Sequence, residues 1–311
     1  MLFRIIIKKL AILLISLFFV VSLTFFLFKL VPGDPFAQEQ AVPEEILHSM
    51  HHHYGLDRPW YVQYALYLKG IITWDLGPSF KYEGRTVNAI IKEGASISLV
   101  LGAEALLIAL IAGIFLGTLS AVKRGSFIDR LCMIGAVVGI SVPNFILATF
   151  LQYIFSMKWG LFPVARWGSF AQSVLPAVAL AMLPTAFIAR LLRASMVEVL
   201  LQDYIVTAKV KGLSFMRIWA CHVFKNSILT VMTYLAPLCS SILTGSFVVE
   251  RIFGIPGLGS WFVTSILNRD YTVIMGLTLF YSGILMASVF LVDVLYTILD
   301  PRIKLSKVAY A

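Results

Sequence analysis

Six long apolar runs divide this 311-residue chain, and they limit its possible folds more than any other feature. The hydrocarbon core of a membrane is about 30 Å thick, so a helix that crosses it needs about 20 apolar residues. The runs have that length and lie at about 5–30, 96–120, 131–156, 173–194, 228–250 and 272–298. Because 59% of the residues are hydrophobic and only 13% are charged, a water-soluble domain could not bury so much apolar surface. We therefore predict an all-α integral membrane protein with six transmembrane helices.

The distribution of Lys and Arg predicts which way these helices face. Cationic side chains in short loops stay on the cytoplasmic side, because they resist translocation and meet anionic lipid there. If the N-terminus is inside, 15 of the 25 Lys and Arg residues fall on the inner side and 4 fall in short outer loops. The other 6 are Lys29, at the outer end of the first run, and five residues in the 31–95 segment, which is long enough to cross regardless of its charge. We expect both termini to be cytoplasmic.

The composition argues against several other classes of protein. The net charge of +9 is spread over the inner helix ends and not gathered on one basic face, so we predict no nucleic-acid partner. The dipeptide Gly-Lys is absent, and with it the phosphate-binding loop that an ATPase on this chain would need. His48, His51, His52 and His53 crowd one predicted loop without the spacing of a metal site, so we predict no metal and no enzymatic activity.

Two polar residues near the apolar runs are candidates for the lining of a translocation pathway. Glu104 lies about 13 Å along the second run at 1.5 Å per residue, and Asn144 lies in "GISVPNFILA" at 139–148. For Glu104 two other interpretations stay open, a structural ion pair with an inner Arg such as Arg190, or a carboxyl kept protonated by burial. The G-x-x-x-G spacings at 113–117 and 135–139 predict that the second and third helices pack tightly.

A polar, basic insert at 195–226 interrupts this apolar pattern and is predicted to face the cytoplasm. We expect a first short helix that Asp203 caps, with Lys209 and Lys211 in its last turn and Gly212 as the left-handed residue after it. Ser214 then caps a second helix. Its apolar face follows the helical period through Phe215, Ile218, Trp219, His222 and Val223. The pattern fits a docking element that points into the cytosol, and it fits equally an amphipathic helix that lies flat on lipid.

The stretch "DYIVTAKVKGLSFMRIWACHVFKNSILTVMT" at 203–233 closely resembles the cytoplasmic coupling loop of binding-protein-dependent ABC importer permeases, in their oligopeptide, dipeptide and nickel branch. The resemblance implies that the residues matching the family pattern couple the chain to an ATPase. They are Tyr204, Thr207, Ala208, Lys211, Gly212, His222 and Asn226. The chain departs from the pattern at Val206, where this branch more usually has Arg, and at Thr230, near a common Pro.

Further stretches look like the same branch, in its order. They are "LVPGDP" at 30–35, "YGLDRPWYVQYALYLKGIITWDLGPSF" at 54–80, "GISVPNFILA" at 139–148, "WGLFPV" at 159–164, "ARLLRASMVEVLLQDY" at 189–204, "ERIFGIPGLG" at 250–259 and "DVLYTILDPRI" at 293–303. The "PGDP" after the first run resembles the first of the two paired permease subunits. The resemblance implies an ABC type I importer permease fold. It divides the chain into a first helix plus a long external loop at 1–95 and a five-helix permease core at 96–311.

The same resemblance implies partners and a location. Expected partners are a homologous second permease subunit, two ABC ATPase subunits that bind ATP and Mg, an external solute-binding protein and membrane lipid, with no cofactor on this chain. The expected location is a bacterial or archaeal cell membrane, the inner one in a Gram-negative cell. Peptides are the expected cargo, and a nickel or glutathione-type importer permease of the same branch stays open. A secondary transporter or channel working alone is the rival class, but it predicts no ATPase-docking insert and usually an internal repeat, which this sequence does not show. A structural membrane scaffold would leave the insert unexplained.

Overall fold

The computed structural model describes residues 2–31, 44–243 and 246–299, and these residues are helical throughout, apart from turns and one isolated bridge between Pro78 and Thr86. Residues 32–35 of the "LVPGDP" motif and the basic residues Arg302, Lys304 and Lys307 lie outside the described part. The helices are α1 (Leu2–Leu30), α2 (Glu44–His53), α3 (Trp60–Thr73), α4 (Val87–Val122), α5 (Phe127–Ser141), α6 (Asn144–Leu151), the π-helical η1 (Gln152–Lys158), α7 (Phe170–Leu200), α8 (Asp203–Val210), α9 (Phe215–Ile218), the π-helical η2 (Trp219–Phe224), α10 (Lys225–Leu243), α11 (Phe247–Phe253), α12 (Leu258–Leu267) and α13 (Tyr271–Leu299).

Four segments of the described chain are long and apolar enough to cross a membrane on their own. They are Ile6–Leu30, Val87–Val122, Phe170–Leu200 and Tyr271–Val292. Two bent pairs, Phe127–Ser141 with Asn144–Lys158 and Phe215–Leu235 with Pro237–Phe253, bring the number to as many as six if each pair is one span. Each of the six predicted runs overlaps one of these segments or pairs. The predicted all-helical membrane class is therefore confirmed, with four to six candidate spans.

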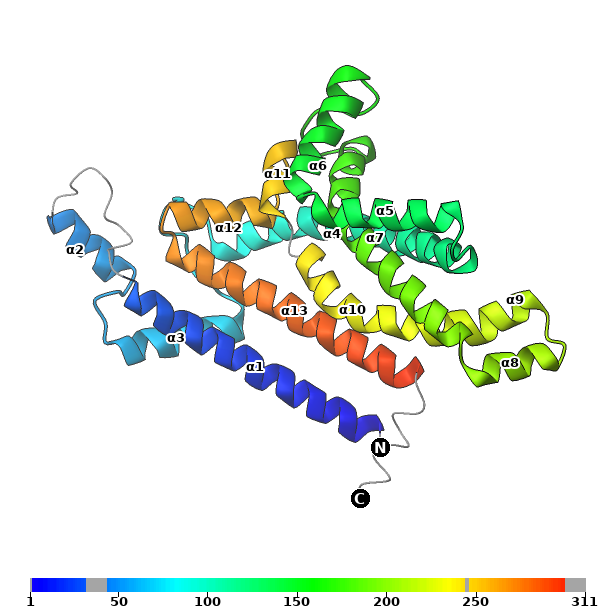
Figure 1. Ribbon diagram of the computed structural model, residues 1–311. Helices are drawn as coiled ribbons and strands as arrows, with labels where there is room; N and C mark the ends of the chain where they lie inside the picture. The colour runs from blue at the N-terminus through cyan, green and yellow to red at the C-terminus, as the bar shows by residue number, and fades with distance from the viewer. Residues whose placement is uncertain (1, 32–43, 244–245, 300–311) are drawn as a thin grey trace. The chain divides into compact units, whose positions relative to one another are not determined.

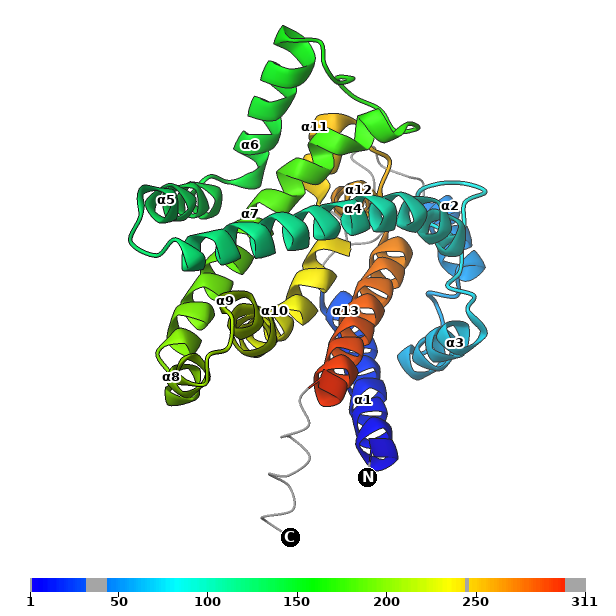
Figure 2. The ribbon, with the colours of Figure 1, turned by 90° about the vertical axis from the view of Figure 1, so that its right-hand side faces the viewer.

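The third predicted run is not one straight helix. Helices α5 and α6 meet at an angle of 106°, and Figure 2 shows α6 turning sharply away from the end of α5. The break has a local cause, because Pro143 cannot donate a helical hydrogen bond and disfavours helical backbone in the residue before it. Val142 accordingly adopts extended backbone at φ −86° and ψ 120°, and Pro143 becomes the N-cap of α6.

The chain divides into two compact units. The first is formed by residues 1–97 and 256–284, and the second by residues 98–255 and 285–311. In the second unit α7 is the central helix, because α5, α6 and α10 all pack on it (Figure 1).

Glycines explain how closely α4 approaches α7 in this second unit. A Cβ atom on Gly113 would lie 2.8 Å from the side chain of Ile188, and one on Gly117 would lie 2.8 Å from the backbone oxygen of Ala189. The second G-x-x-x-G spacing behaves differently, since a Cβ on Gly139 would meet the Cβ of Ala186 on α7 at 3.2 Å and one on Gly135 would meet nothing within 4 Å. The predicted tight packing is therefore confirmed at Gly113, Gly117 and Gly139 but not at Gly135, and the close partner of both helices is α7.

In the first unit, Asp270 fastens the segment before α4 to the start of α13. This fully buried carboxylate accepts hydrogen bonds from the Ser79 hydroxyl, from the Phe80 backbone N–H at 3.2 Å and from the Thr272 hydroxyl at 3.0 Å. The Thr272 hydroxyl also donates to the Pro78 carbonyl at 2.8 Å. Several donors thus replace the water that a buried carboxylate loses.

Candidate functional site

The predicted insert at 195–226 begins within the last two turns of α7, which continues to Leu200, and ends at the start of α10. Helix α8 then begins with Asp203, and the cap position belongs to Gln202, whose side chain makes no capping hydrogen bond. The prediction that Asp203 is the cap was therefore wrong by one position. Its carboxylate still stands in the first turn, where it favours the helix dipole.

The turn after α8 is built as the sequence predicts. Gly212 has φ +73°, the left-handed conformation that glycine adopts without a Cβ clash. Its N–H donates to the Lys209 carbonyl at 3.0 Å, and the Leu213 N–H donates to the Ala208 carbonyl at 3.2 Å, which are the two bonds of a Schellman motif. The Ser214 hydroxyl accepts from the Arg217 N–H at 3.4 Å and caps α9. These bonds fix the reversal of the chain.

The second helix of the insert does not end there. Helix α9 runs through η2 into α10, so the predicted short helix is the start of a longer one (Figure 1). Ile218, Trp219 and Val223 of the predicted apolar face are buried, and His222 is half-buried. Phe215 is 59% exposed, and its ring lies 5.6 Å from that of Trp219, one turn further along on the same face. The later residues of this face are buried because the helix continues through η2 into the apolar helix α10.

The structure brings some of the predicted coupling residues together. The Asn226 amide donates to the Tyr204 hydroxyl at 3.0 Å, which ties α8 to the first turn of α10. The Thr207 hydroxyl donates to the backbone carbonyl of Asp203 at 3.1 Å. Ala208 is a buried residue of α8, while Lys211 and Gly212 are exposed after its end. His222 lies on η2.

The outward surface of the insert is apolar as well as basic. Val210 is 83% and Met216 is 73% exposed. The other large apolar side chains exposed on this surface are Leu201, Tyr204, Val206 and Phe215. Such a cluster at the tip of two short helices is typical of a surface that another molecule covers.

Near the last turns of α7, Arg193 forms an ion pair with the buried carboxylate of Asp129. Together with Ser120, this pair connects α4, α5 and α7. Arg193 on α7 donates to Asp129 on α5 through Nε at 2.7 Å and through Nη2 at 2.8 Å. The same carboxylate accepts from the Ser120 hydroxyl on α4 and from the Gly125 N–H at 2.8 Å. Sequence reasoning missed this group, although Ser126 and Asp129 have the S-x-x-D spacing of a capping box, and the Ser126 hydroxyl does cap α5.

A second buried carboxylate was also missed. Glu250 on α11 is fully buried and accepts from the Ser98 hydroxyl at 2.9 Å. Its position in "ERIFGIPGLG" gave no sign of burial, because the distant residue that approaches it cannot be read from the local pattern.

The two predicted pathway residues are not joined to each other. Glu104 is half-buried on α4, and its Oε2 atom is buried without a hydrogen-bond partner among the described residues. The alternative pairing with Arg190 is not formed between these described residues, and Arg190 is exposed on α7. Asn144 is the first residue of α6, directly after the 106° bend. Their role in a pathway stays a prediction.

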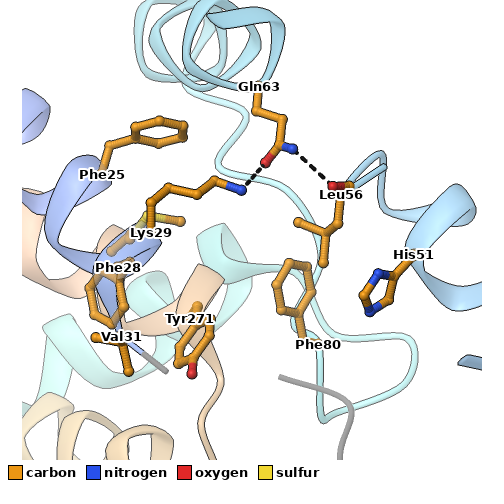
Figure 3. Close-up of a pocket in the computed structure, with 10 residues that line it drawn as sticks. Phe25, Phe28, Lys29, Val31, His51, Leu56, Gln63, Phe80 and Tyr271 are labelled. Carbon is orange, nitrogen blue, oxygen red and sulfur yellow. Dashed lines mark hydrogen bonds between the residues drawn. The ribbon is translucent and has the colours of Figure 1, made fainter. Parts of the chain in front are cut away.

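The first unit contains a cavity of about 540 Å³ beside the C-terminal end of α1 (Figure 3). Phe25, Phe28, Phe80 and Tyr271 supply aromatic walls. The Lys29 ammonium donates to the Gln63 carbonyl oxygen at 2.6 Å, and the Gln63 amide donates to the Leu56 carbonyl at 3.0 Å. The histidine cluster forms the end of α2, and only His51 of the four lines this cavity. No group of three or more His, Cys, Asp or Glu side chains in the described ranges is placed to hold a metal ion.

Comparison with known proteins gives consistent matches. The family model described as "Binding-protein-dependent transport system inner membrane component" matches residues 113–305, and the corresponding N-terminal model matches residues 1–85. The chain is 50% identical over 288 residues to the dipeptide transport system permease protein DppB of Bacillus subtilis strain 168, covering 93% of this chain and 94% of that protein. It is 39% identical over 303 residues to the oligopeptide transport system permease protein OppB of Haemophilus influenzae, covering 97% and 99%.

A solved structure described as an amino acid ABC transporter with histidines has a similar fold. It superposes with a TM-score of 0.53 and 17% identity, and the match covers 67% of this chain and 94% of that one. With the two family models and these relatives, the chain belongs to the binding-protein-dependent transport system inner membrane components, the permeases of ABC importers.

Proposed function

We propose that this chain is one of two paired permease subunits of an ATP-driven importer of dipeptides or longer oligopeptides. The observation that carries the proposal is the 50% identity to a dipeptide permease over nearly the full length of both chains. Every relative considered carries a dipeptide or oligopeptide transport name, which favours peptide cargo over nickel or glutathione.

The proposed assembly contains this chain, a homologous second permease, two cytoplasmic ATPases that bind ATP and Mg, and an external solute-binding protein. This chain crosses the cell membrane six times with both termini in the cytoplasm, and each bent helix pair counts as one crossing. Residues 1–95 supply the first span and an external segment, and residues 96–311 supply the permease core. The excess of Lys and Arg in the short loops of one side supports this orientation.

Helix α8 is the proposed contact with an ATPase. Closure of the ATPases around ATP can switch the permease only through contacts that differ between its two states. The exposed apolar side chains at the tip of the insert would fill a groove on the ATPase, and the Schellman turn would hold α8 at a fixed angle. The bond between Tyr204 and Asn226 would pass a displacement of α8 to α10.

The experiment compares two substitutions of Gly212 in the reconstituted importer. A Cβ on Gly212 meets nothing within 4 Å, so a side chain acts there only through the backbone conformation. At positive φ, Asn is tolerated, whereas a β-branched residue is strained by about 1–2 kcal/mol. Gly212→Val should therefore insert in the membrane but reduce ATP-dependent uptake of a labelled dipeptide several-fold, and Gly212→Asn should keep most of it.

Three readouts separate the outcomes. Co-purification reports whether the ATPases stay bound, phosphate release reports hydrolysis, and proteoliposome uptake reports transport. Uptake by the wild-type chain without ATPases would overturn the importer proposal in favour of a secondary transporter. Normal uptake and normal ATPase content in Gly212→Val would leave the importer in place but remove the coupling role of α8. Competition by unlabelled dipeptide, and not by a nickel chelate or glutathione, tests the cargo.

A further inference from the structure

Helix α3 is too short to cross a membrane and yet presents an apolar surface. Its 14 residues span about 21 Å at 1.5 Å per residue, against about 30 Å of hydrocarbon. None of its residues is buried within the described structure. Its Tyr61 and Ile72 side chains are 60% and 85% exposed. The single charge in the helix is Lys69.

The contacts of α3 with α1 set its depth. The Tyr64 hydroxyl is hydrogen-bonded to the Ser22 hydroxyl at 2.6 Å, and its ring packs on Phe25 and Phe26 at 5.2 and 5.4 Å between centroids. One turn further along α1, Lys29 is bonded to Gln63 (Figure 3). Residues 22–30 are the last part, about 12 Å, of the apolar span Ile6–Leu30. Figure 1 shows α3 beside this end of α1.

Helix α1 also presents exposed apolar side chains in the part that contacts α3. Leu23 and Leu27 of α1 are 46% and 52% exposed, on a helix that crosses a membrane. A side chain level with Ser22 therefore faces acyl chains unless protein covers it. Helix α3 meets the demands of that environment, because a helix satisfies its own backbone hydrogen bonds and a lone Lys can extend its ammonium to the headgroups. Trp60, Tyr61 and Trp74 stand near its ends, as aromatic side chains do at membrane interfaces.

We propose that α3 is a non-spanning helix embedded in the leaflet at the C-terminal end of α1, with Tyr61 and Ile72 on lipid acyl chains and Lys69 directed to the headgroups. Under the topology proposed above this is the outer leaflet. Helix α3 belongs to the segment that was predicted to be an external loop. In this proposal it anchors that segment to lipid, next to the residues around Ser79 and Phe80 that are hydrogen-bonded to Asp270.

The test places an environment-sensitive fluorophore on the complete importer in lipid nanodiscs. Cys132, Cys221 and Cys239 are first replaced by Ala, and Ile72→Cys is labelled with NBD. Leu27→Cys on α1 is the matched lipid-facing control, and Glu83→Cys, in the exposed turn before α4, is the water-facing control. Each sample is titrated with lipids that carry a spin label high on the acyl chain and, separately, with iodide in the buffer.

The label on Ile72→Cys should lose fluorescence to the lipid quencher as strongly as the label on Leu27→Cys, and iodide should quench only Glu83→Cys strongly. Strong quenching of the Ile72 position by iodide would place α3 in water and overturn the proposal. Quenching by neither agent would show that protein covers the face, and it would also overturn the proposal. None of these outcomes depends on transport activity, so the assignment of α3 and the proposed import function fail separately.

Discussion

At the scale of single residues, the buried carboxylates show how an apolar chain tolerates charge. Removing a carboxylate from water costs several kcal/mol unless donors replace the lost water. Asp129 meets this cost with the bidentate guanidinium of Arg193, a hydroxyl and a backbone N–H. The donors come from α4, α7 and the turn before α5, so the same bonds hold these segments together.

Removing the guanidinium should destabilise this part of the protein. Arg193→Leu leaves Asp129 buried without its cation, and because Arg193 is 27% exposed we expect a loss of about 1–3 kcal/mol. The thermal unfolding temperature of the detergent-solubilised chain should fall by several degrees. Arg190→Leu, on an exposed position three residues earlier on α7, is the matched control and should leave it unchanged. Equal unfolding temperatures for the two variants would mean that the pair contributes nothing.

At the scale of helices, the contacts of α4 with α7 depend on two glycines. The surroundings of Gly117 contain the backbone oxygen of Ala189, which cannot rotate away as a flexible side chain can. Membrane helices gain stability from such close packing, because lipid supplies no hydrophobic force between them.

Gly117→Val should force α4 away from α7 and cost about 1–3 kcal/mol, the usual range for overpacking. Gly135→Val is the control, since a Cβ atom added at Gly135 meets nothing within 4 Å. The measurement is the yield of monodisperse chain and its thermal unfolding temperature after purification. A Gly135→Val variant as damaged as Gly117→Val would show that helix propensity and not packing decides the effect.

Local patterns predicted the elements better than their pairing. The apolar runs located the candidate spans, and Gly212 with Ser214 located the turn, because length, positive φ and capping are properties of a few neighbouring residues. Pro143 is a local signal for the bend between α5 and α6, but the continuous apolar run around it led to the prediction of a single helix. The partner of Gly117 and the donors to Asp129 and Asp270 were not readable, because residues up to about two hundred positions away supply them.

At the scale of the whole molecule, function depends on which surfaces face each side of the membrane. The insert can meet a cytoplasmic ATPase only if it lies on the same side as the basic loop at 122–126. The ion pair between Asp129 and Arg193 supports this arrangement, because it joins the start of α5 to α7 only seven residues before α7 ends at Leu200. The loops around Glu83 and Ser169 should then lie on the opposite side.

Labelling of single cysteines with an impermeant thiol reagent tests this topology in intact cells, after Cys132, Cys221 and Cys239 have been replaced. We expect Glu83→Cys and Ser169→Cys to react from outside and Arg124→Cys and Met216→Cys to react only after the membrane is opened. All four positions are exposed, so accessibility within the chain does not bias the comparison. Ser79 would be a poor choice because it is buried against Asp270. Labelling of Met216→Cys from outside would place the insert beyond the reach of any cytoplasmic ATPase, and the coupling role of α8 would have to be abandoned.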